Sequence, residues 1–360
     1  MLFNLNPRTS VHRFIFPSLP LLFLYVSLFL TNSCSSVNHL SRVELEEVAP
    51  KLKCIRERGA LDIGSGSTKF TLAKVNLCEN KIVQILEKKQ FPLKFKEHLS
   101  YNNGVLKEEI YQQATNELIT YFKNIPLEKK YIKAVATEVF RQAMNGEEFV
   151  GRLSQSLGIE IHLISQEEEA LLGFKGAQVV TGKKASEIVV WDIGGGSMQM
   201  TSSHLGGYHF YKGKLASVSL KNEVLKWKGK KRGSPNPLGQ YLGQKALYHS
   251  AHYAKENVPS LIKEAIEKGK EVIGVGGVHY YSIREQLNLY ANTPYSYYQL
   301  EQALDKRVHF HDQQFNGHYK ETEATNIALV LGHMKELNIR TVLPVKVDLA
   351  TGLLFTERFW

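Results

Sequence analysis

The chain has 360 residues, enough for two domains of ordinary size with hydrophobic cores. Apolar residues make up 43% of the sequence and charged residues 22%, which excludes a wholly disordered chain. The formal net charge of +10 favours an anionic partner, such as a phosphorylated substrate, a membrane surface or nucleic acid, although a basic charge can also serve solubility alone.

The N-terminal segment differs from the rest of the chain. Arg8 and Arg13 precede an uncharged apolar run at residues 14–30, and small and polar residues surround Cys34. This order is typical of a secretory signal or a short membrane anchor, so we expect residues 1–36 to direct export or membrane attachment. Arginines before the run favour a periplasmic location for the remainder of the chain. Cys34 is a candidate for lipidation, and a cytoplasmic protein is the alternative.

The chain contains three cysteines, whose spacing matches no zinc motif. If Cys34 is cleaved off or lipidated, Cys54 and Cys78 are left to pair in an oxidising compartment. Two free thiols are an equal alternative. Residues 37–54 are expected to be a linker.

Regular secondary structure is predicted from about Ile55 onward. Apolar or alternating runs predict strands, and helical spacing of apolar residues predicts helices. The expected strands cover residues 59–64, 69–75, 81–89, 131–137 and 159–165. The expected helices cover residues 107–122 and 145–158, and Gly158 stops the second one.

A second strand-rich unit is predicted to begin at residues 187–194. Helices follow it, then a strand at residues 271–277 and a helical C-terminal third. We therefore expect lobe I at residues 55–168, lobe II at residues 169–342, and a C-terminal helix at residues 343–360 that returns to lobe I.

One short motif occurs twice. The sequence from Asp62 to Ser67, DIGSGS, recurs from Asp192 to Ser197 as DIGGGS, and each copy closes an apolar strand and precedes another strand-like run. The duplication predicts an α/β fold with two similar lobes, each a mixed sheet flanked by helices, whose glycine loops face one cleft.

The repeated glycines predict a phosphate site, because backbone amides without neighbouring side chains can converge on one anion. Asp192, at a strand end beside such a loop, is a natural Mg²⁺ ligand, since Mg²⁺ takes few carboxylates and shares phosphate oxygens. Asp62 is the equivalent metal candidate in the first copy. Two hairpin turns, each with a capping aspartate, are the structural alternative, and neither copy matches a Walker A or Rossmann motif. The expected phosphate-binding residues are Gly64, Ser65, Gly66, Ser67, Thr68, Gly194, Gly195, Gly196 and Ser197.

Two further segments carry candidate catalytic side chains. Ser165 and Glu168 have the spacing of a capping box, so a helix is expected to start at Glu167. Glu169 lies on a different face, where a partly shielded carboxylate can act as a general base, although compensation of the helix dipole also explains it. Arg141 follows an apolar strand and is either a bidentate phosphate ligand or an exposed helix residue.

Residues 225–233 place five basic side chains within seven positions, with Trp227 among them. A solvated loop is the ordinary interpretation. For a long polyanion the segment would act as an electrostatic funnel, and binding would weaken with salt. No sequence motif supports nucleic acid as the partner.

Six segments in this order resemble the exopolyphosphatase and guanosine pentaphosphate phosphohydrolase family (Ppx/GppA). The resemblance extends from about Gly59 to Phe355 and implies an actin-like, ribonuclease H-like fold of two lobes, related to sugar kinases, with polyphosphate or pppGpp in the interlobe cleft. It implies that Glu169 activates water, that Arg141 contacts phosphate and that Asp192 holds magnesium. The two glycine loops would bind the terminal phosphoryl group. The matching segments are ALDIGSGSTKF, ATEVFRQAMNGEEF, ISQEEEALLGFKGA, VVWDIGGGS, VIGVGGVHY and VDLATGLL.

The sequence departs from the family pattern at three positions. Gln199 stands where the family usually has a glutamate that helps to bind metal, Gly66 where asparagine is common, and Val278 where threonine is usual. Metal affinity and nucleotide recognition are the properties these departures affect. Because the chain ends at Trp360, we also expect it to lack the additional C-terminal helical domain of longer members.

The expected function is that of a phosphoric anhydride hydrolase, assisted by Mg²⁺ or another divalent cation, that releases terminal phosphate from inorganic polyphosphate. Export favours polyphosphate over pppGpp, because the alarmone is cytoplasmic. The alternatives are a pppGpp phosphohydrolase with a membrane anchor and a catalytically weak protein that binds polyphosphate or nucleotide. A homodimer is left open, and no nucleic-acid partner is expected.

Overall fold

The computed structural model describes residues 53–317 and 319–360. The expected leader at residues 1–36, with Cys34, and almost all of the expected linker at residues 37–54 lie outside the described residues. Within the described ranges, no helix is both long enough and apolar enough to cross a membrane.

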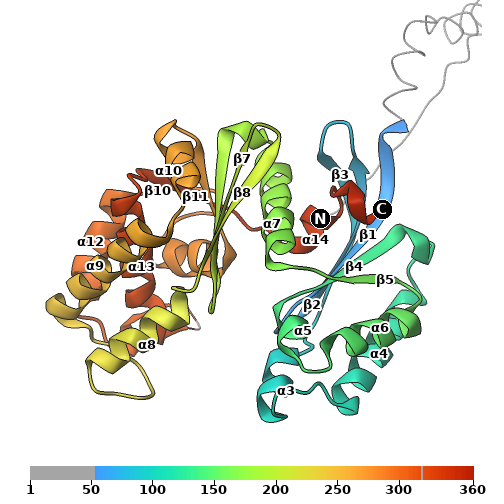
Figure 1. Ribbon diagram of the computed structural model, residues 1–360, viewed down its shortest axis with the longest axis horizontal. Helices are drawn as coiled ribbons and strands as arrows, with labels where there is room; N and C mark the ends of the chain where they lie inside the picture. Colours follow the sequence, from blue (N-terminus) through green and yellow to red (C-terminus); the bar gives the residue numbers. More distant parts are fainter. Residues whose placement is uncertain (1–52, 318) are drawn as a thin grey trace, which may run out of the picture. The chain divides into compact units, whose positions relative to one another are not determined.

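The first sheet has five strands in the order β3-β2-β1-β4-β5 (Figure 1). The central strand β1 pairs antiparallel with β2 and parallel with β4, and β4 pairs parallel with β5. All five strands expected in this region are therefore present. Their bounds are β1 (Ile55–Ile63), β2 (Thr68–Asn76), β3 (Lys81–Phe91), β4 (Ile132–Ala136) and β5 (Glu160–Leu163).

The second sheet has six strands in the order β10-β11-β9-β6-β7-β8. Its central strand β6 pairs antiparallel with β7 and parallel with β9, as β1 does with β2 and β4. The predicted α/β fold with duplicated mixed sheets is thus confirmed. The bounds are β6 (Ile188–Ile193), β7 (Met198–His204), β8 (Gly207–Gly213), β9 (Glu271–Val275), β10 (Tyr295–Ser296) and β11 (Thr341–Pro344).

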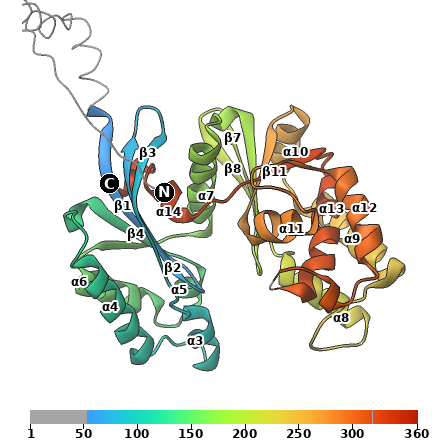
Figure 2. The same cartoon turned by 180° about the vertical axis from the view of Figure 1, so that it is seen from behind.

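Helices cover both sheets (Figures 1 and 2). The helices beside the first sheet are α3 (Phe95–Tyr101), α4 (Glu108–Phe122), α5 (Glu138–Gln142) and α6 (Gly146–Leu157). The helices beside the second sheet are α8 (Ser217–Trp227), α9 (Gly239–Asn257), α10 (Ser260–Glu267), η3 (Val278–Ile283), α11 (Arg284–Gln286), α12 (Tyr297–Arg307) and α13 (Glu323–Glu336). The predicted stop at Gly158 is confirmed, since this residue caps α6 with a φ of 62°. Short helical turns are η1 (Lys129–Tyr131), η2 (Ala185–Glu187), η4 (Asp312–Gln314), η5 (Lys320–Thr322) and η6 (Glu357–Phe359).

Helix α7 (Gln166–Thr181) lies between the two sheets (Figures 1 and 2). Its Leu172 belongs to a core cluster with β1, β2 and β4, whereas its Phe174 and Ala177 pack with β6 and β9. Helix α14 (Leu349–Leu353) crosses α7 closely, because a Cβ on Gly352 would lie 1.9 Å from the Leu172 carbonyl oxygen. The N-terminal turn of α7 is thereby held between both lobes.

The helical C-terminal third is the part of the prediction that the structure corrects. Residues 295–296 and 341–344 form β10 and β11, and β11 pairs parallel with β9 inside the second sheet. A run as short as TVLP has no periodicity that distinguishes a strand from a helix. Its strand conformation is therefore determined by pairing with β9. The domain boundaries at residues 168/169 and 342/343 stay predictions, and the first of them falls within α7.

Cys54 and Cys78 form a disulfide in the structure. The bond joins the residue before β1 to the turn between β2 and β3. Of the two interpretations of these cysteines, pairing is the one that the structure contains.

Candidate active site

The two glycine loops have the same construction. The strand pairs end at Ile63–Thr68 in the first copy and at Ile193–Met198 in the second, so each loop has four residues. Each is closed by a backbone bond from its first amide to its fourth carbonyl, Gly64 to Ser67 at 3.2 Å and Gly194 to Ser197 at 3.0 Å. Both loops are therefore hairpin turns, and the question is whether they also bind an anion.

Packing within the protein does not explain why most of these loop positions are glycine. The φ angles of the five loop glycines are not in the left-handed region that favours glycine. A Cβ on Gly66 or Gly196 would meet no atom within 4 Å, and one on Gly195 would make an ordinary contact at 3.6 Å. Of the five, Gly64 alone is tight, with a Cβ position 3.0 Å from the Ser67 oxygen. The missing side chains leave open space beside the backbone.

The amides along these loops are available to a ligand. In the part of the chain that the structure describes, the N–H groups of residues 65–67 and 195–197 donate no hydrogen bond to protein. Free amides beside open space are what an oxyanion site needs. Thr68 differs from the other predicted phosphate ligands, since it is the first residue of β2 and its hydroxyl is fully buried without a partner.

Asp62 and Asp192 occupy equivalent positions, one residue before the end of β1 and of β6. Asp62 is 6% exposed, and its Oδ1 has no hydrogen-bond partner. Burial raises the pKa of Asp62 to about 7 and that of Asp192 to about 6. These carboxyl groups lack the compensation that a buried carboxylate normally receives, so a cation beside them would be stabilised.

Glu169 brings a third carboxylate to this place. Its negative charge raises the pKa of both Asp62 and Asp192, so the three carboxylates lie near one another. Burial raises the pKa of Glu169 itself, and Arg141 opposes that shift. The predicted base is thus close enough to both predicted metal ligands, one from each lobe, for their charges to interact.

Arg141 and Glu169 form an ion pair. A terminal guanidinium nitrogen of Arg141 lies 3.0 Å from Glu169 Oε2, and the other donates to the Ile164 carbonyl at 2.6 Å. Their side chains are 26% and 28% exposed, so both remain accessible from the solvent. The sequence suggested each residue separately but gave no signal that they pair.

The first turn of α7 assigns a different role to each of its glutamates. Ser165 and Glu168 form the predicted capping box, which is confirmed, although the helix starts at Gln166. Glu167 is paired with Lys212, and Glu168 also binds Arg358 at 2.7 Å. Glu169 is the one of the three that pairs with Arg141.

Sequence reasoning missed a glycine that closes over Asp192. Gly276 follows β9 with a φ of +83°, and a Cβ there would lie 2.2 Å from Asp192 Oδ1. Any side chain at this position would collide with the carboxylate. The GVGG run after a predicted strand was the available signal, but nothing in the sequence pairs it with Asp192.

Gln199, the departure from the family pattern, lies directly across the ladder from Asp192. It is buried, and its amide donates to the Ser197 hydroxyl at 3.1 Å. The side chain therefore supports the second loop and adds no charge beside Asp192.

The residues present fit a divalent cation of the Mg²⁺ kind. No group of three or more His, Cys, Asp or Glu side chains among residues 53–317 and 319–360 is arranged as a complete metal site. Mg²⁺ does not require one, because it commonly takes one or two carboxylates and completes its shell with water and phosphate oxygens. The unpartnered Asp62 oxygen and the partly buried Asp192 supply that donor set.

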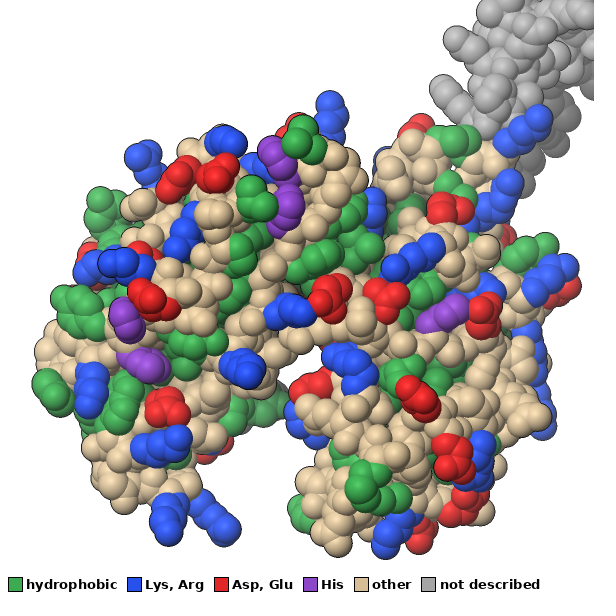
Figure 3. Space-filling model, viewed as in Figure 1, with side chains coloured by type: hydrophobic (Ala, Val, Ile, Leu, Met, Phe, Trp, Pro, Cys, Tyr) green, Lys and Arg blue, Asp and Glu red, His purple; other side chains and the backbone are tan. Residues whose placement is uncertain are grey.

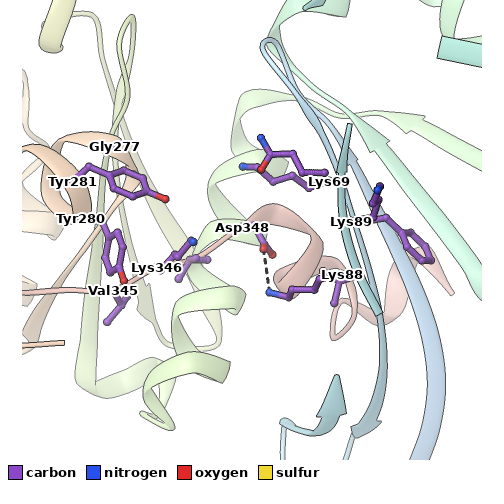
Figure 4. Close-up of a pocket in the computed structure, with 14 residues that line it drawn as sticks. Lys69, Lys88, Lys89, Gly277, Tyr280, Tyr281, Val345, Lys346 and Asp348 are labelled. Carbon is purple, nitrogen blue, oxygen red and sulfur yellow. Dashed lines mark ion pairs between the residues drawn. The ribbon is translucent and has the colours of Figure 1, made fainter. Parts of the chain in front are cut away.

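A cavity of about 390 Å³ is lined by Gly276, which lies against Asp192, and by Lys69, which is opposite Asp62 in the β1–β2 ladder. Figure 4 shows this cavity. Lys69 and Lys88 lie on one face of the β2–β3 ladder, and Lys346 adds another cation to the lining, whereas Tyr280 and Tyr281 come from the segment after Gly277. The lining is Lys69, Phe70, Thr71, Lys88, Lys89, Gln90, Gly276, Gly277, Tyr280, Tyr281, Val345, Lys346, Val347 and Asp348.

The charge of this cavity is mainly positive. Lys69 lines the cavity, and its positive charge lowers the pKa of both Asp62 and Asp348. Lys88 lies 3.6 Å from Asp348, whose other oxygen caps α14 through Thr351. Figure 3 shows a hollow in this face of the molecule with blue Lys and Arg side chains on its rim. None of these cavity residues was a candidate from the sequence.

A sequence model of the Ppx/GppA phosphatase family matches residues 71–331, well over half of the chain. The chain belongs to the Ppx/GppA phosphatase family. The resemblance found in the sequence is thereby confirmed, and the predicted class, a phosphohydrolase, is the class of this family.

Two Ppx/GppA relatives align with different parts of the chain. A bifunctional 3-dehydroquinate synthase/phosphatase of Fusobacterium nucleatum is 27% identical over 275 residues, which cover 71% of this chain and 39% of the relative. A guanosine-5′-triphosphate,3′-diphosphate pyrophosphatase of Vibrio atlanticus is 32% identical over 142 residues, which cover 39% of this chain and 28% of the relative. The chain thus spans less than half the length of these relatives.

Solved Ppx/GppA structures share the fold over nearly their whole length. The Aquifex aeolicus family member superposes with a TM-score of 0.68 at 20% identity, covering 84% of this chain and 98% of its own. An exopolyphosphatase from Cytophaga hutchinsonii superposes with a TM-score of 0.58 at 16% identity, covering 84% and 97%.

Proposed function

We propose that the chain is a phosphoric anhydride hydrolase that releases the terminal phosphate of inorganic polyphosphate. One observation carries the proposal: Glu169 lies near Asp62 and Asp192, at the ends of two strands that lead into glycine loops with free amides. This arrangement can hold a phosphoryl group beside a base. Membership of the Ppx/GppA family supports the same reaction class.

In this proposal Glu169 orients a water molecule and accepts a proton from it as the water oxygen attacks the terminal phosphorus. The bond from that phosphorus to the bridging oxygen breaks, and the shortened polyphosphate leaves with the electron pair on that oxygen. Burial raises the pKa of Glu169 and makes it a better base than a surface glutamate. The ion pair with Arg141 holds the carboxylate in one orientation, and in this proposal the guanidinium also contacts a phosphate oxygen. The loop amides stabilise the charge of the transferred group.

Asp62 and Asp192 are the residues proposed to hold a divalent cation such as Mg²⁺. When bound, the cation would polarise the phosphoryl oxygens and offset their charge. Asp62 is buried and Asp192 partly buried, and neither has a cationic partner sufficient to keep its pKa low, which supports this role. Gly276 fixes Asp192 by leaving room for its carboxylate.

Polyphosphate is favoured as the substrate by the charge of the adjoining cavity. Lys69, Lys88 and Lys346 face a space in which Asp348 is the acidic lining residue. A linear chain of phosphates carries charge along its whole length and suits such a lining. Lys69 lines the cavity and is also the residue opposite Asp62 in the β1–β2 ladder, which supports a path from the cleavage position into the cavity.

A pppGpp phosphohydrolase is the second candidate, and Tyr280 and Tyr281 favour it. Their rings lie on the cavity wall and offer apolar faces to a purine. A competition assay with both substrates at matched concentrations separates the candidates. The first proposal requires that polyphosphate be preferred, and a preference for pppGpp would replace it.

A catalytically weak binding protein is the third candidate, which Gln199 favours because it adds no charge beside Asp192. Tight binding of polyphosphate or nucleotide without phosphate release across several divalent metals would establish it. Metal-dependent release of phosphate would exclude it.

We also propose that the chain acts outside the cytoplasm. The disulfide between Cys54 and Cys78 supports this, because such bonds persist in oxidising compartments. Fractionation of the cells tests it: the protein is expected in the periplasmic or membrane fraction, and recovery from the cytosol alone would contradict export.

The catalytic assignment is tested by Glu169→Gln, which removes the base while keeping the size of the side chain. We expect phosphate release from polyphosphate to fall by about 10²–10⁴-fold. Glu167→Gln is the matched control, since it changes a glutamate in the same helical turn that pairs with Lys212. Equal rates for Glu169→Gln and the unmodified chain would refute the assignment.

A further inference from the structure

Helix α8 begins directly on the second glycine loop. The amides of Ser217 and Val218 donate to the carbonyls of Gly194 and Gly195 at 3.4 and 2.8 Å. These bonds hold the loop carbonyls on the helix side. Eleven residues at 1.5 Å each make the helix about 16 Å long, so its other end lies about that far from the loop.

The far end of α8 leads into the basic segment found in the sequence. The backbone there is fixed: Gly229 has a φ of +70°, and the Lys230 amide donates back to the Leu225 carbonyl at 2.9 Å. The Lys228 ammonium donates to the carbonyls of Pro235 and Pro237 at 2.6 and 2.7 Å. Lys228 is therefore a structural residue of the loop.

The next three residues, Lys230, Lys231 and Arg232, form what we call the basic tip. All three are exposed, and no ion pair involving them is present in the described part of the structure. Figure 3 shows Lys and Arg side chains projecting at the lower left, below α8. Asp312 forms no ion pair with them in the described part of the structure, and its Oδ1 instead accepts from Ser234 and Asn236 at 2.6 and 2.9 Å.

Other cations of α8 are already paired. Lys221 binds Glu321 at 3.1 Å, and Lys226 binds Glu223 at 2.9 Å. The charge of the basic tip is thus the uncompensated part of this surface. It lies on a fixed loop, which lowers the entropic cost of binding a partner.

We infer that the basic tip is a second contact for polyphosphate, which holds the part of a long chain that lies away from the cleaved end. The inference rests on the proposed function. A phosphate chain whose end lies in the second glycine loop can follow α8 and reach the tip, whereas a substrate of only a few phosphates cannot span about 16 Å. Long chains therefore gain an electrostatic contact that short ones lack.

The tip is less suited to single-stranded nucleic acid. Stacking on aromatic rings contributes much of the affinity in such complexes. Trp227, the aromatic residue of this segment, is already packed, with the Lys245 ammonium 4.6 Å from its ring and the His249 ring at 5.5 Å. A partner that is charged but has no bases fits the surface better.

The test replaces Lys230, Lys231 and Arg232 together by alanine in the full chain. We expect the KM for long-chain polyphosphate to rise about tenfold, while kcat and the KM for tripolyphosphate stay unchanged. The salt dependence of log KM for the long chain should become shallower by about 2. The matched control replaces three exposed lysines beside the first sheet, Lys81, Lys107 and Lys123, and should change neither quantity.

An unchanged KM and salt slope for the long chain in the tip variant would overturn the inference, as would equal changes in the control. If the unmodified chain releases phosphate from neither substrate, the proposed function fails, and equilibrium binding of labelled long-chain polyphosphate decides the inference instead. Weaker binding by the tip variant alone supports it. Loss of binding to single-stranded RNA or anionic vesicles, with polyphosphate unaffected, overturns it.

Discussion

Among single residues, the site is defined by carboxyl groups that are costly to keep charged. Asp62 is buried and Asp192 partly buried at two strand ends, and the negative charge of Glu169 acts on both. Arg141 pairs with Glu169 and not with either aspartate. The two aspartates therefore keep their protons to a higher pH than usual, and a bound cation would reverse that shift.

This arrangement predicts an unusual pH dependence of stability. The folded-state pKa values of Asp62 and Asp192, about 7 and about 6, lie above the ordinary value of 3.8. Between about pH 4 and pH 7 the folded chain holds more protons than the unfolded chain, so the contribution of these groups to the free energy of unfolding falls as the pH rises. Mg²⁺ should consequently raise the melting temperature at pH 7.5 and have little effect at pH 5.

Thermal melts with and without Mg²⁺ at the two pH values measure this effect. Asp192→Asn is the informative variant: without Mg²⁺ it should melt higher than the unmodified chain at pH 7.5, because the neutral amide avoids the cost of a buried charge. It should also lose most of the response to Mg²⁺. A response equal at both pH values, or retained in full by Asp192→Asn, would argue against these metal ligands.

The sequence indicated candidate site residues more readily than the contacts between them. Glu169 stood out because the capping box accounted for Glu168, and the structure contains that box. The ion pair between Arg141 and Glu169 could not be predicted, because it joins side chains 28 residues apart in the chain. Contacts of this kind depend on how α5 and α7 meet in the fold.

Among the elements, the glycine loops are built so that a ligand can approach their backbone. A Cβ on Gly66 would meet no protein atom within 4 Å, so the protein itself leaves room for a side chain there. Gly276 has no such room, because a Cβ there would lie 2.2 Å from Asp192 Oδ1. The two glycines thus serve different purposes. One leaves space for a phosphate, and the other leaves space for a protein carboxylate.

Substitution by alanine separates these purposes. Gly66→Ala should change the free energy of unfolding by about 0.5 kcal/mol or less, yet lower kcat/KM by about 10–100-fold, because the methyl group occupies space beside the loop amides. Gly276→Ala should lower stability by about 2–3 kcal/mol as well as activity. Denaturant unfolding and phosphate release on the same preparations test both. Full activity of Gly66→Ala would remove the case for phosphate at the first loop.

The hairpin of β2 and β3 is tied to the start of β1 by the disulfide between Cys54 and Cys78. The closed loop spans 24 residues, for which the chain-entropy model gives about 3 kcal/mol of stabilisation. Cys78→Ser should therefore lower the free energy of unfolding by about that amount in oxidising buffer. Reduction of the disulfide in the unmodified chain should lower the free energy of unfolding by the same amount. If neither the substitution nor the reduction changes the free energy of unfolding, the bond does not form in solution.

The elements themselves were predictable where their pattern was long or repeated. The five strands of the first sheet and the two hairpin loops followed from apolar runs and from the DIGxGS repeat. Strand β11 was not predictable, because its four residues acquire strand geometry from pairing with β9. The cavity beside the aspartates was missed for a similar reason, since Lys69, Tyr280 and Lys346 come from three distant segments.

In the molecule as a whole, the duplication places an aspartate and a glycine loop on each of two sheets, and α7 connects them. Its residues pack against both sheets, and its first turn carries Glu169. Our main proposal is that the two aspartates, the two glycine loops and Glu169 together catalyse cleavage of the terminal phosphoanhydride bond of polyphosphate. Family membership sets the reaction class, and the positively charged cavity favours the substrate.

The decisive experiment is phosphate release from long-chain polyphosphate by the purified full chain, measured with Mg²⁺ and again after the metal is removed by chelation. We expect release of orthophosphate that depends on the metal and shortens the chain from its end. Tight binding of polyphosphate with no phosphate released under any divalent metal would contradict the proposal.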